Sequence, residues 1–371
     1  MGTPAAAYFS TRLSGSKVWP AASAVAFGTQ VGAIIIPLGL GINILMLLTK
    51  TTQTLNIDLW NYWHFAFIGS IVSIATRSFL WGVFAATITI IVTLVGADRS
   101  QKKVEEFYGE DLKGVSLPQA FCVSFIPFAI AVNWIVERIP GLNKVDFDAK
   151  KLEKRFQLGI ILSAVMVLIP KITGMFIEGL NPISTRSQEL VSKKFKGRAF
   201  NIGMTPALVI GHPTTLVVSL LLVPTILFLS VIVPGNEFLP LASLSGLIYI
   251  FPLVLPYTKG NVLRSFLVGL VSLVAGVLSA TALASIFTSA VRMVQSNLIP
   301  AGTSSVASID FAASPLAWIV YEFTANLTLV GPIVIAVITL GLMVWNRKKI
   351  AANDVQKSVK EPAAVHSETT N

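Results

Sequence analysis

Charged residues are scarce in this sequence. Aspartate, glutamate, lysine and arginine make up 12% of its 371 residues, whereas hydrophobic residues make up 54%. A soluble domain carries about 25% charged residues, and the mean hydropathy here is +0.74. The long, nearly charge-free apolar runs do not fit the weak alternating pattern of a β-barrel. The composition therefore predicts an all-α polytopic membrane protein.

Cysteine is almost absent, since Cys122 is the single one. One cysteine excludes an internal disulfide and a multi-cysteine metal site. A phosphate-carrying cysteine needs an accessible, electropositive setting, whereas the segment Ala120–Val123 is apolar with no basic neighbour. The sequence also lacks a Walker-type glycine loop, so we expect no cofactor, no metal and no direct use of ATP.

The formal net charge of +10 raises the question of nucleic acid as a partner. The lysines and arginines are concentrated in a few loops and in the tail, as the positive-inside rule expects of a membrane protein. We therefore expect the lipid bilayer, and no nucleic acid, as their partner.

The stretch Gly203–Pro240 organises the rest of the chain. Its apolar run, Leu216–Val233, is long enough to cross most of a bilayer core, which takes ~20 residues. Proline and glycine interrupt the chain before this run, at Gly211–Pro213, and after it, at Pro234–Gly235. Backbone freed by such breaks survives at membrane depth only inside protein or beside a wet cavity. The stretch predicts broken helices around a midplane cavity on the path of a polar solute.

The N-terminal half holds further interrupted runs. Val18–Leu48 is apolar, and a polar turn separates it from the aromatic-rich segment Asn56–His64. The next run, Phe65–Gly96, is too long for one straight span at ~1.5 Å per residue and contains Arg77. We interpret it as a re-entrant half-helix followed by a full helix from about Phe79.

Two segments follow that we do not interpret as spans. Asp98–Lys113 is polar and charged, which predicts that it lies in water. Leu117–Ile139 is apolar but is split by Pro127 and carries Glu137 and Arg138. The pattern favours an amphipathic hairpin or an interfacial helix.

The charge topology is inconsistent around Phe156–Ile177. This run has the composition of a span, but basic loops flank it at 140–155 and 181–198. One span between two basic loops puts one of them on the wrong side of the membrane. Either Phe156–Ile177 does not cross, or a helix is missing from the chain.

The C-terminal half continues the pattern. Phe238–Tyr257 is cut by prolines, and Val262–Val291 is a helix whose small residues suit close packing. Ala317–Trp345 is the last predicted span, and the basic cluster Arg347–Lys349 after it predicts a cytoplasmic C-terminus.

We divide the chain into one membrane permease domain, residues 1–349, and a polar tail that is disordered by composition, residues 350–371. Both halves of the permease domain contain a span, then a polar segment with one histidine, then a broken apolar run. Such an echo is typical of transporters built from inverted repeats.

Four ordered motifs make the sequence similar to a known family. They are Asn-Ile-Asp-Leu-Trp-Asn-Tyr-Trp-His at 56–64, Glu-Arg-Ile-Pro-Gly-Leu-Asn at 137–143, Pro-Ala-Leu-Val-Ile-Gly-His at 206–212 and Val-Pro-Gly-Asn-Glu-Phe-Leu-Pro at 233–240. They resemble the galactitol-type enzyme IIC, the membrane permease of the bacterial phosphoenolpyruvate-dependent phosphotransferase system, in the ascorbate–galactitol superfamily.

The resemblance runs over nearly the whole chain and implies a homodimeric carrier of the bacterial inner membrane, with a scaffold part and a moving transport part. It implies that the substrate is a polyol such as galactitol, or a related sugar. The partners would be a cytoplasmic IIB protein and, indirectly, IIA. A phosphocysteine on IIB, rather than on this chain, would phosphorylate the substrate.

The chain departs from the family pattern in several places. The family has membrane segments before the region that matches Val18, which implies a truncated N-terminus. The family also has one more apolar segment, at the position that corresponds to the junction between Arg155 and Gln157 here. The charge topology fails at the same place, and the agreement of these two observations favours a missing helix. Thr205 stands where relatives often carry Asp, and Arg77 where they often carry Gly. These departures leave the substrate and the transport competence open.

Histidine is the first type of candidate site residue. His212 follows a helix break and precedes Pro213 and Thr214. A neutral imidazole there could hydrogen-bond a sugar hydroxyl or accept its proton. The alternative is a structural histidine that satisfies backbone groups freed by Pro213. His64 has the same two interpretations, since it could also lie at the headgroup level beside Trp63.

Asp310 is the acidic candidate, because a carboxylate that accepts hydroxyl hydrogen bonds is a common way to hold a polyol. Its alternative is a cap for the last span, a role for which Ser314 competes. The remaining candidates for substrate contact are Thr214, Asn236, Glu237, Asp58 and Asn61. The alternative is an ordinary turn for Asn236 and Glu237, and a solvated interfacial turn for Asp58 and Asn61.

The basic loops at 144–155 and 186–198 are expected to dock IIB, with plain positive-inside anchoring as the alternative. Two other functions stay open besides phosphotransferase-coupled uptake. One is an ion-coupled or facilitative permease, and the other is a truncated, non-transporting remnant.

Overall fold

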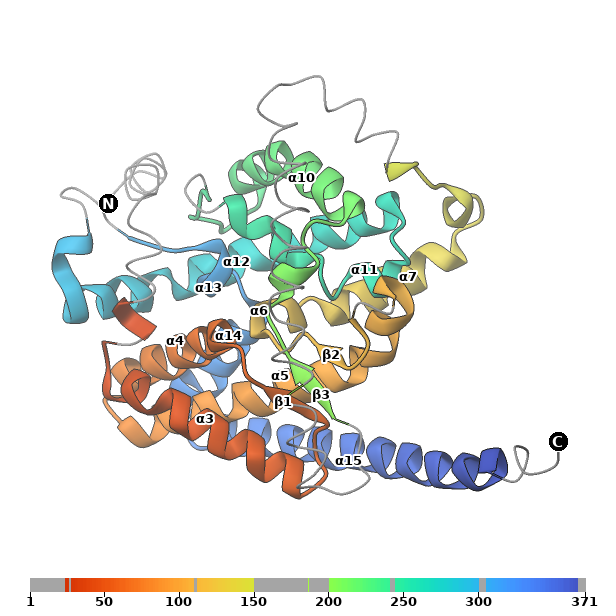
Figure 1. The fold of residues 1–371 in the computed structure, drawn as a ribbon. Helices are drawn as coiled ribbons and strands as arrows, with labels where there is room; N and C mark the ends of the chain where they lie inside the picture. The colour runs from red at the N-terminus through yellow and green to blue at the C-terminus, as the bar shows by residue number, and fades with distance from the viewer. Residues whose placement is uncertain are drawn as a thin grey trace.

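The structure, a computed structural model, describes residues 24–26, 28–109, 112–149, 186, 200–240, 244–299 and 305–365. The segment Phe156–Ile177 and the position of the expected missing helix lie outside the described residues. Within the described part, helices predominate (Figure 1), which confirms the all-α polytopic class. Among the described residues, six helical segments have the length and composition to cross a membrane: Gln30–Leu48, Phe79–Tyr108, Ala120–Arg138, Pro213–Ile232, Val262–Leu298 and Val330–Asn353.

Helices α3 (Gln30–Leu48), α4 (Leu59–Thr76) and α5 (Phe79–Tyr108) pack against one another. The break between α4 and α5 falls at Arg77, whose φ of 53° is left-handed, and α5 begins at Phe79. The predicted interruption is therefore confirmed, and α4 folds back on α5. Two glycines allow this close approach, because a Cβ on Gly82 would lie 2.6 Å from the carbonyl oxygen of Gly69.

The prediction that Asp98–Lys113 lies in water is wrong for Asp98. Helix α5 continues through this segment as far as Tyr108, and Asp98 is only 7% exposed. Its Oδ2 accepts hydrogen bonds from Thr52 Oγ1 (2.7 Å), the Gln53 N–H (3.1 Å) and Asn346 Nδ2 (2.7 Å), and its Oδ1 accepts one from Thr54 Oγ1 (2.8 Å). A buried carboxylate is stable when donors surround it in this way. Asp98 thus joins α5 to the segment before the first strand and to the C-terminal helix.

Helices α6 (Ala120–Val123) and α7 (Ile126–Arg138) follow one another after a short turn. Pro127 lies in the first turn of α7, where no backbone N–H is needed, so it starts the helix rather than breaking it. Together the two helices have the length and composition of a span, whereas the sequence favoured a hairpin or an interfacial helix.

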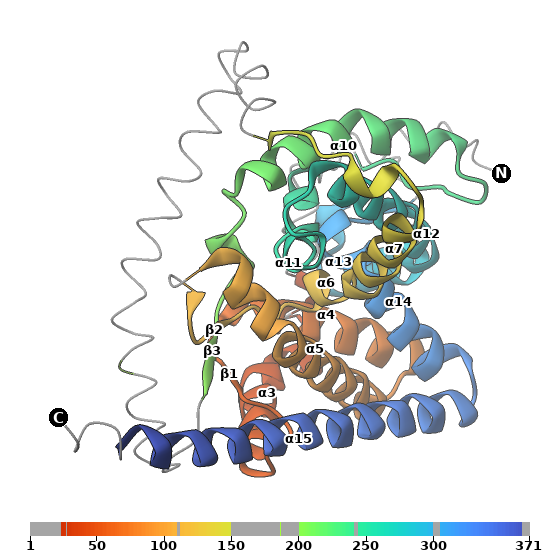
Figure 2. The ribbon, with the colours of Figure 1, turned by 90° about the vertical axis from the view of Figure 1, so that its right-hand side faces the viewer.

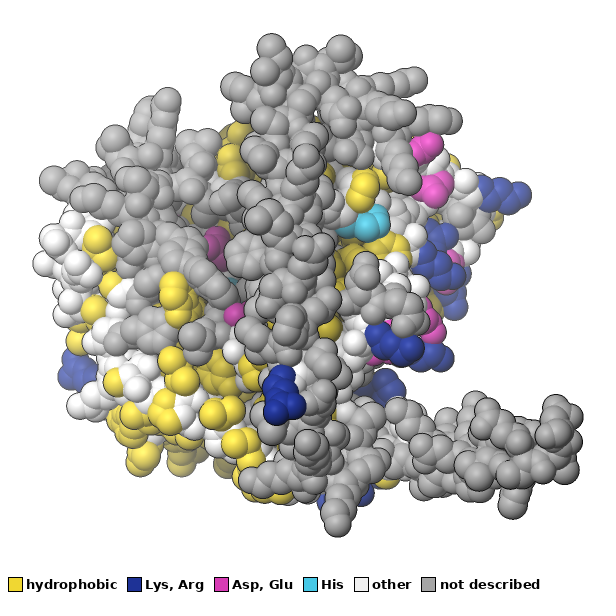
Figure 3. Space-filling view, viewed as in Figure 1, with side chains coloured by type: hydrophobic (Ala, Val, Ile, Leu, Met, Phe, Trp, Pro, Cys, Tyr) yellow, Lys and Arg dark blue, Asp and Glu magenta, His cyan; other side chains and the backbone are white. Residues whose placement is uncertain are grey.

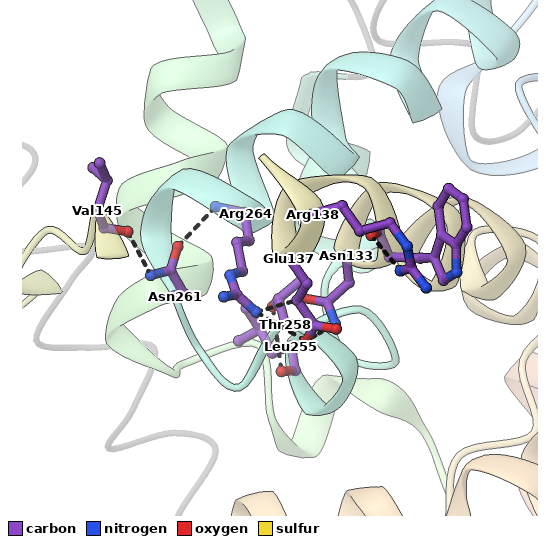
Figure 4. A network of polar contacts seen from close by, with 9 residues as sticks. Asn133, Glu137, Arg138, Val145, Leu255, Thr258, Asn261 and Arg264 are labelled. Carbon is purple, nitrogen blue, oxygen red and sulfur yellow. Dashed lines mark hydrogen bonds and ion pairs between the residues drawn. The ribbon is translucent and has the colours of Figure 1, made fainter. Parts of the chain in front are cut away.

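A polar network ties the C-terminal end of α7 to the start of α12 (Val262–Gln295), as Figure 4 shows. Arg264 Nη1 donates to Asn133 Oδ1 (2.8 Å) and lies 3.5 Å from Glu137 Oε1. Asn261 caps α12 by accepting from the Arg264 N–H (2.8 Å) and donates to the Val145 carbonyl (3.0 Å). The motif at 137–143 therefore begins in a helix–helix junction.

The central run of the sequence forms α10 (Pro213–Ile232), which packs along α12 (Figure 2). A 3₁₀ turn, η3 (Pro206–Leu208), precedes it. The run Phe238–Tyr257, which follows α10 and contains several prolines, forms two short helices rather than one span. They are η4 (Leu244–Ile250) and α11 (Leu255–Thr258).

The last predicted span, Ala317–Trp345, is wrong as a single helix. The described C-terminal part consists of η5 (Ser296–Leu298), α13 (Ile309–Ala312), α14 (Pro315–Tyr321), the π-helical turn η6 (Glu322–Asn326) and α15 (Val330–Val365). Pro332 explains the break, since a proline has no N–H for the carbonyl four residues earlier, at Thr328, and its ring clashes with that carbonyl, but it fits the first turn of a new helix. Thr328 has a positive φ of 23° at this point. Helix α15 continues past residue 350, where the sequence placed the start of the tail.

Three short strands form a parallel sheet that the sequence did not predict. They are β1 (Thr54–Asn56), β2 (Val115–Ser116) and β3 (Asn201–Gly203), in the order β1-β3-β2. The last residues of β1 and β2, Asn56 and Ser116, both pair with Gly203. The carboxyl ends of all three strands therefore meet at one edge.

On the face of the molecule shown in Figure 3, most apolar and most basic side chains lie in different areas. Figure 3 shows exposed hydrophobic side chains at the lower left, over α3, and most of the visible lysines and arginines on the right. The exposed apolar residues of α3 are Ile36, Leu40, Ile44, Leu45 and Leu48. A helix with such a face in a chain of this composition is expected to contact lipid.

Candidate functional site

A cavity of about 320 Å³ lies at the carboxyl edge of the small sheet. Each strand leads into a segment that lines it: β1 into α4, β2 into α6, and β3 into η3. Helices η4 and α13 complete the wall. The lining residues are Trp63, His64, Gln119, Phe121, Thr205, Ala207, Leu208, Tyr249, Asp310 and Phe311.

His64 lies between two aromatic rings of this wall. Its ring stacks on Phe311, with centroids 4.8 Å apart and planes inclined by 22°, and faces Phe121 at 6.5 Å and 16°. The side chain is 6% exposed. Enclosure by apolar rings favours the neutral imidazole, because a buried charge without a partner is costly. His64 is thus held in one orientation beside the cavity.

Gln119 lies beside His64, and sequence reasoning missed it. Its Nε2 is 3.3 Å from His64 Nε2, and its Oε1 accepts a hydrogen bond from Cys122 Sγ (2.9 Å). An amide nitrogen can only donate, so Gln119 Nε2 donates to His64 Nε2, and the proton of the neutral imidazole lies on Nδ1. No spacing in the sequence marks Gln119, since it reaches the cavity only because β2 pairs with β3.

Asp310 enters the cavity from the first turn of α13. A Cβ on Gly246 would lie 2.7 Å from Asp310 Oδ1, so the glycine of η4 makes room for the carboxylate. The capping alternative belongs to Ser314, whose hydroxyl accepts a hydrogen bond from the Ala317 N–H (3.3 Å) at the start of α14. The structure therefore separates the two acceptors, with Asp310 at the cavity and Ser314 at the helix.

Tyr249 adds a second group that the sequence did not single out. Burial, with further contributions from Cys122, Asp310 and Asp58, raises the pKa of Tyr249. Its phenol therefore stays protonated near neutral pH and can donate a hydrogen bond.

Among the described residues, no cluster of three or more histidine, cysteine, aspartate or glutamate side chains is arranged to hold a metal.

His212 does not line this cavity. It is the N-cap of α10, and its Nδ1 accepts a hydrogen bond from the Thr214 N–H (3.2 Å). Its ring packs near Phe107 and Tyr108, with centroids 5.1 and 6.1 Å away. Thr214 in turn donates from Oγ1 to the Gly260 carbonyl (3.0 Å). This geometry matches the structural alternative for His212, and it gives the Thr214 hydroxyl a backbone partner.

Asn236 and Glu237 lie in the turn after α10, away from the cavity lining. Asn236 Nδ2 donates to the carbonyls of Ser230 (2.8 Å) and Phe238 (2.9 Å), and its Oδ1 accepts from Thr281 Oγ1 (2.9 Å). Glu237 is exposed. The amide therefore holds the turn against α12.

Asp58 and Asn61 lie at the start of α4, one turn before His64. Asn61 is fully buried, and its Nδ2 donates to Asn56 Oδ1 (3.0 Å), which also accepts from the Asp58 N–H (3.3 Å). Neither lines the cavity. Both connect β1 to α4 and so position His64.

Comparison with known proteins matches this chain to the family model of the phosphotransferase-system (PTS) sugar-specific permease component, EIIC-GAT, over residues 2–158 and 152–302. The chain belongs to this family. A permease IIC component of Escherichia coli (strain K12), described without a substrate, is 32% identical over 357 residues, which cover 88% of this chain and 80% of that protein. The galactitol-specific EIIC components of Escherichia coli K12 and O157:H7 are each 27% identical over 362 residues, covering 89% of this chain and 79% of theirs.

The two segments matched by the EIIC-GAT model meet at residues 152–158. The segment that the family resemblance implies is missing, between Arg155 and Gln157, falls at the same position. Membership makes the chain a multi-pass membrane component of a phosphotransferase system. The missing segment, the inverted repeats and the domain division stay predictions.

Proposed function

We propose that this EIIC-GAT protein binds a polyol or a related sugar in the cavity beside His64 and Asp310 and carries it across the inner membrane. The observation that carries the proposal is the convergence of five polar groups from five segments on one cavity: His64, Gln119, Thr205, Tyr249 and Asp310. A volume of about 320 Å³ is at the lower end of the ~300–1,000 Å³ typical of small-molecule sites, which suits a substrate of this size.

The lining has the chemistry that a polyol needs. Hydroxyl groups can donate to the Asp310 carboxylate, in the strong charge-assisted class of hydrogen bond. Gln119, Thr205 and Tyr249 supply neutral donors and acceptors for the remaining hydroxyls. The rings of Phe121 and Phe311 offer flat apolar surface to the carbon chain.

Phosphorylation would use a phosphocysteine on IIB and an acceptor for the proton of the attacked hydroxyl on this chain. Asp310 is the group of the cavity that can accept it, because His64 Nε2 already accepts from Gln119 and its Nδ1 carries the proton, and His212 lies elsewhere. Cys122 is unsuited as the phosphate carrier, since it is fully buried and its thiol lies 2.9 Å from both Gln119 Oε1 and the Tyr249 carbonyl.

The partners and the topology follow from family membership as further parts of the proposal. We infer a homodimer, a cytoplasmic IIB that docks on the basic loops at 144–155 and 186–198, and a cytoplasmic C-terminus set by Arg347–Lys349. Of these two loops, the structure describes residues 144–149 and residue 186, and the other loop residues lie outside the described part. Galactitol is the first substrate to test, because two relatives are named for it.

Inverted membrane vesicles containing the protein test the proposal. Radiolabelled galactitol, and a panel of other hexitols, should be phosphorylated only when phosphorylated IIB is supplied. Asp310→Asn should abolish the reaction, whereas Glu237→Gln, a change in an exposed turn, should leave it intact. Uptake that proceeds equally well without IIB would exclude the proposal and favour an ion-coupled or facilitative permease.

A further inference from the structure

A second hollow, separate from the cavity, opens between α5, α7, α14 and α15. It measures about 560 Å³ and forms an open groove with mostly apolar walls. We propose that this groove binds an anionic glycerophospholipid of the bilayer, with the phosphate at Arg99 and Lys349 and an acyl chain along the apolar walls. The inference is independent of the transported substrate. Besides Arg99 and Lys349, the polar residues that line the groove are Ser124 and Tyr257.

The groove has apolar walls that end in a cation on two helices. On α5, the lining residues Val92, Val95, Gly96 and Arg99 are spaced by three, one and three positions, so they share one helix face. On α15, Leu342, Trp345 and Lys349 do the same. An acyl chain could therefore lie along either face for two helical turns before it reaches a positive charge.

Arg99 and Lys349 lie at the same end of the groove. The Arg99 guanidinium stacks on the Trp345 ring at 3.1 Å from its centroid, and its Nη2 is 3.4 Å from the Trp345 carbonyl. Lys349 lies one helical turn beyond Trp345 on the same face. This arrangement places two cations together beside a tryptophan, which is a residue favoured at the membrane interface.

The sequences of both helices place the bilayer surface at this level. After Arg99, α5 continues with Ser100-Gln101-Lys102-Lys103, and after Trp345, α15 continues with Asn346-Arg347-Lys348-Lys349. Asp98, which accepts four hydrogen bonds from residues 52–54 and Asn346, also acts electrostatically on Arg99 and Lys349, and Glu106 pairs with Lys102 at 3.6 Å. The cations outnumber the acids, since Arg99, Lys102, Lys103, Arg347, Lys348 and Lys349 face Asp98, Glu105 and Glu106. The net local charge is positive, which matches a lipid phosphate.

The same charges argue against a second copy of the chain as the occupant. Two grooves facing each other across a two-fold axis would bring Arg99 and Lys349 of both copies together, and like charges in an interface oppose association. A polyol is also a poor match, because the apolar walls would leave most of its hydroxyls without partners.

Native mass spectrometry of the delipidated protein tests this site. Phosphatidylglycerol and phosphatidylcholine with identical acyl chains are added in turn, and the retained lipid is counted. We expect about tenfold stronger retention of phosphatidylglycerol by the wild type, since two cations act on one phosphate. The double variant Arg99→Gln with Lys349→Gln should lose that preference.

Arg138→Gln is the matched control. Arg138 stacks on Trp134 at 3.8 Å and donates to its carbonyl (3.0 Å), so it repeats the Arg99–Trp345 pairing outside the groove. It should keep the wild-type preference. Lys349→Gln alone covers the case in which the double variant does not fold, and should lower the preference. Leu316→Trp, which fills the groove, should lower retention of both lipids.

Four results would overturn the proposal. One is equal retention of the two lipids by the wild type, and another is an unchanged preference in Lys349→Gln and in the double variant. The third is Leu316→Trp converting a dimer to a monomer without altering lipid retention, which would assign the groove to an interface between copies. Competition by soluble glycerol phosphate as strong as that by the lipid would likewise exclude the role of the acyl chain.

Discussion

His64 and His212 look alike in the sequence, since each precedes or begins an apolar helix and each closes a family motif. The fold gives them different surroundings. His64 lies between two phenyl rings, with Gln119 beside it and Asp310 in the same wall. His212 caps α10 and is not among the residues that line that cavity. The comparison teaches that a histidine at a helix break can serve the backbone alone, and that a site needs polar groups from several segments.

Replacing the acid of the His64 site should have the largest effect. Asp310→Asn keeps the shape of the side chain but removes the charge, and hydrogen bonds to charged groups contribute ~1.5–3 kcal/mol each. We expect galactitol, or the hexitol identified by the vesicle assay, to bind about 10- to 100-fold more weakly. Isothermal titration calorimetry in detergent measures this. Unchanged affinity would remove Asp310 from the site.

Replacing His64, in the same cavity, should have the second largest effect on substrate binding. His64→Phe keeps an aromatic ring between Phe121 and Phe311 but removes both ring nitrogens, so about tenfold weaker binding is expected from the loss of one neutral hydrogen bond. His212→Asn is the paired variant and should bind within about twofold of the wild type. If the two variants exchanged these results, the contrast between the two histidines would be reversed.

Thermal stability, unlike substrate binding, should depend on His212. His212→Ala removes the acceptor for the Thr214 N–H, and the loss of an N-cap costs about 1 kcal/mol. Asparagine is a strong N-cap, so His212→Asn should restore the wild-type midpoint of thermal unfolding. The measurement is the unfolding of purified protein in detergent, followed by intrinsic fluorescence. Equal midpoints for the alanine and asparagine variants would contradict the capping role.

A smaller effect should depend on pH. Burial lowers the pKa of His212 from its usual 6.5. Above pH 6.5 the imidazole is neutral in both the folded and the unfolded chain; as the pH falls through 6.5, the unfolded chain takes up a proton that folded His212 refuses until its lower pKa is reached. The wild type should therefore lose more stability between pH 7.5 and pH 5.5, which bracket that pKa, than His212→Asn does. Parallel pH profiles would show that His212 titrates normally.

The smallest expected effect is the reactivity of the Cys122 thiol, which lies behind His64 and Gln119. It is fully buried, and its thiol lies beside Gln119 Oε1. A maleimide reagent should leave it unlabelled in the folded protein and label it fully in sodium dodecyl sulfate. Rapid labelling before unfolding would mean that the cavity wall around Gln119 opens to water.

The sequence was informative where a local signal decides the structure. Hydropathy located α3, α5, α10 and α12, and Arg77 correctly marked the break before α5, because proline, glycine and charge act within a few residues of where they stand. The capping choice between Asp310 and Ser314 was also posed correctly from neighbours in the chain. These features depend on short-range physics.

Long-range contacts decided the rest. Asp98 looked solvated, but its four donors come from residues 52–54 and from Asn346, which are distant in sequence. Strands of two and three residues carry no periodic signal. Gln119 and Tyr249 therefore could not be recognised, because only the sheet and the folded η4 bring them to His64.

The sheet also sets the order in which the protein can be made. Strand β3 lies between β1 and β2 but is the last of the three to leave the ribosome, so neither earlier strand has a partner until residues 201–203 emerge. Parallel strands need long crossover connections, whose closure costs entropy. The helices of the first half can enter the membrane early, whereas the cavity beside His64 can form only after β3 and the later lining elements η4 and α13 have been synthesised.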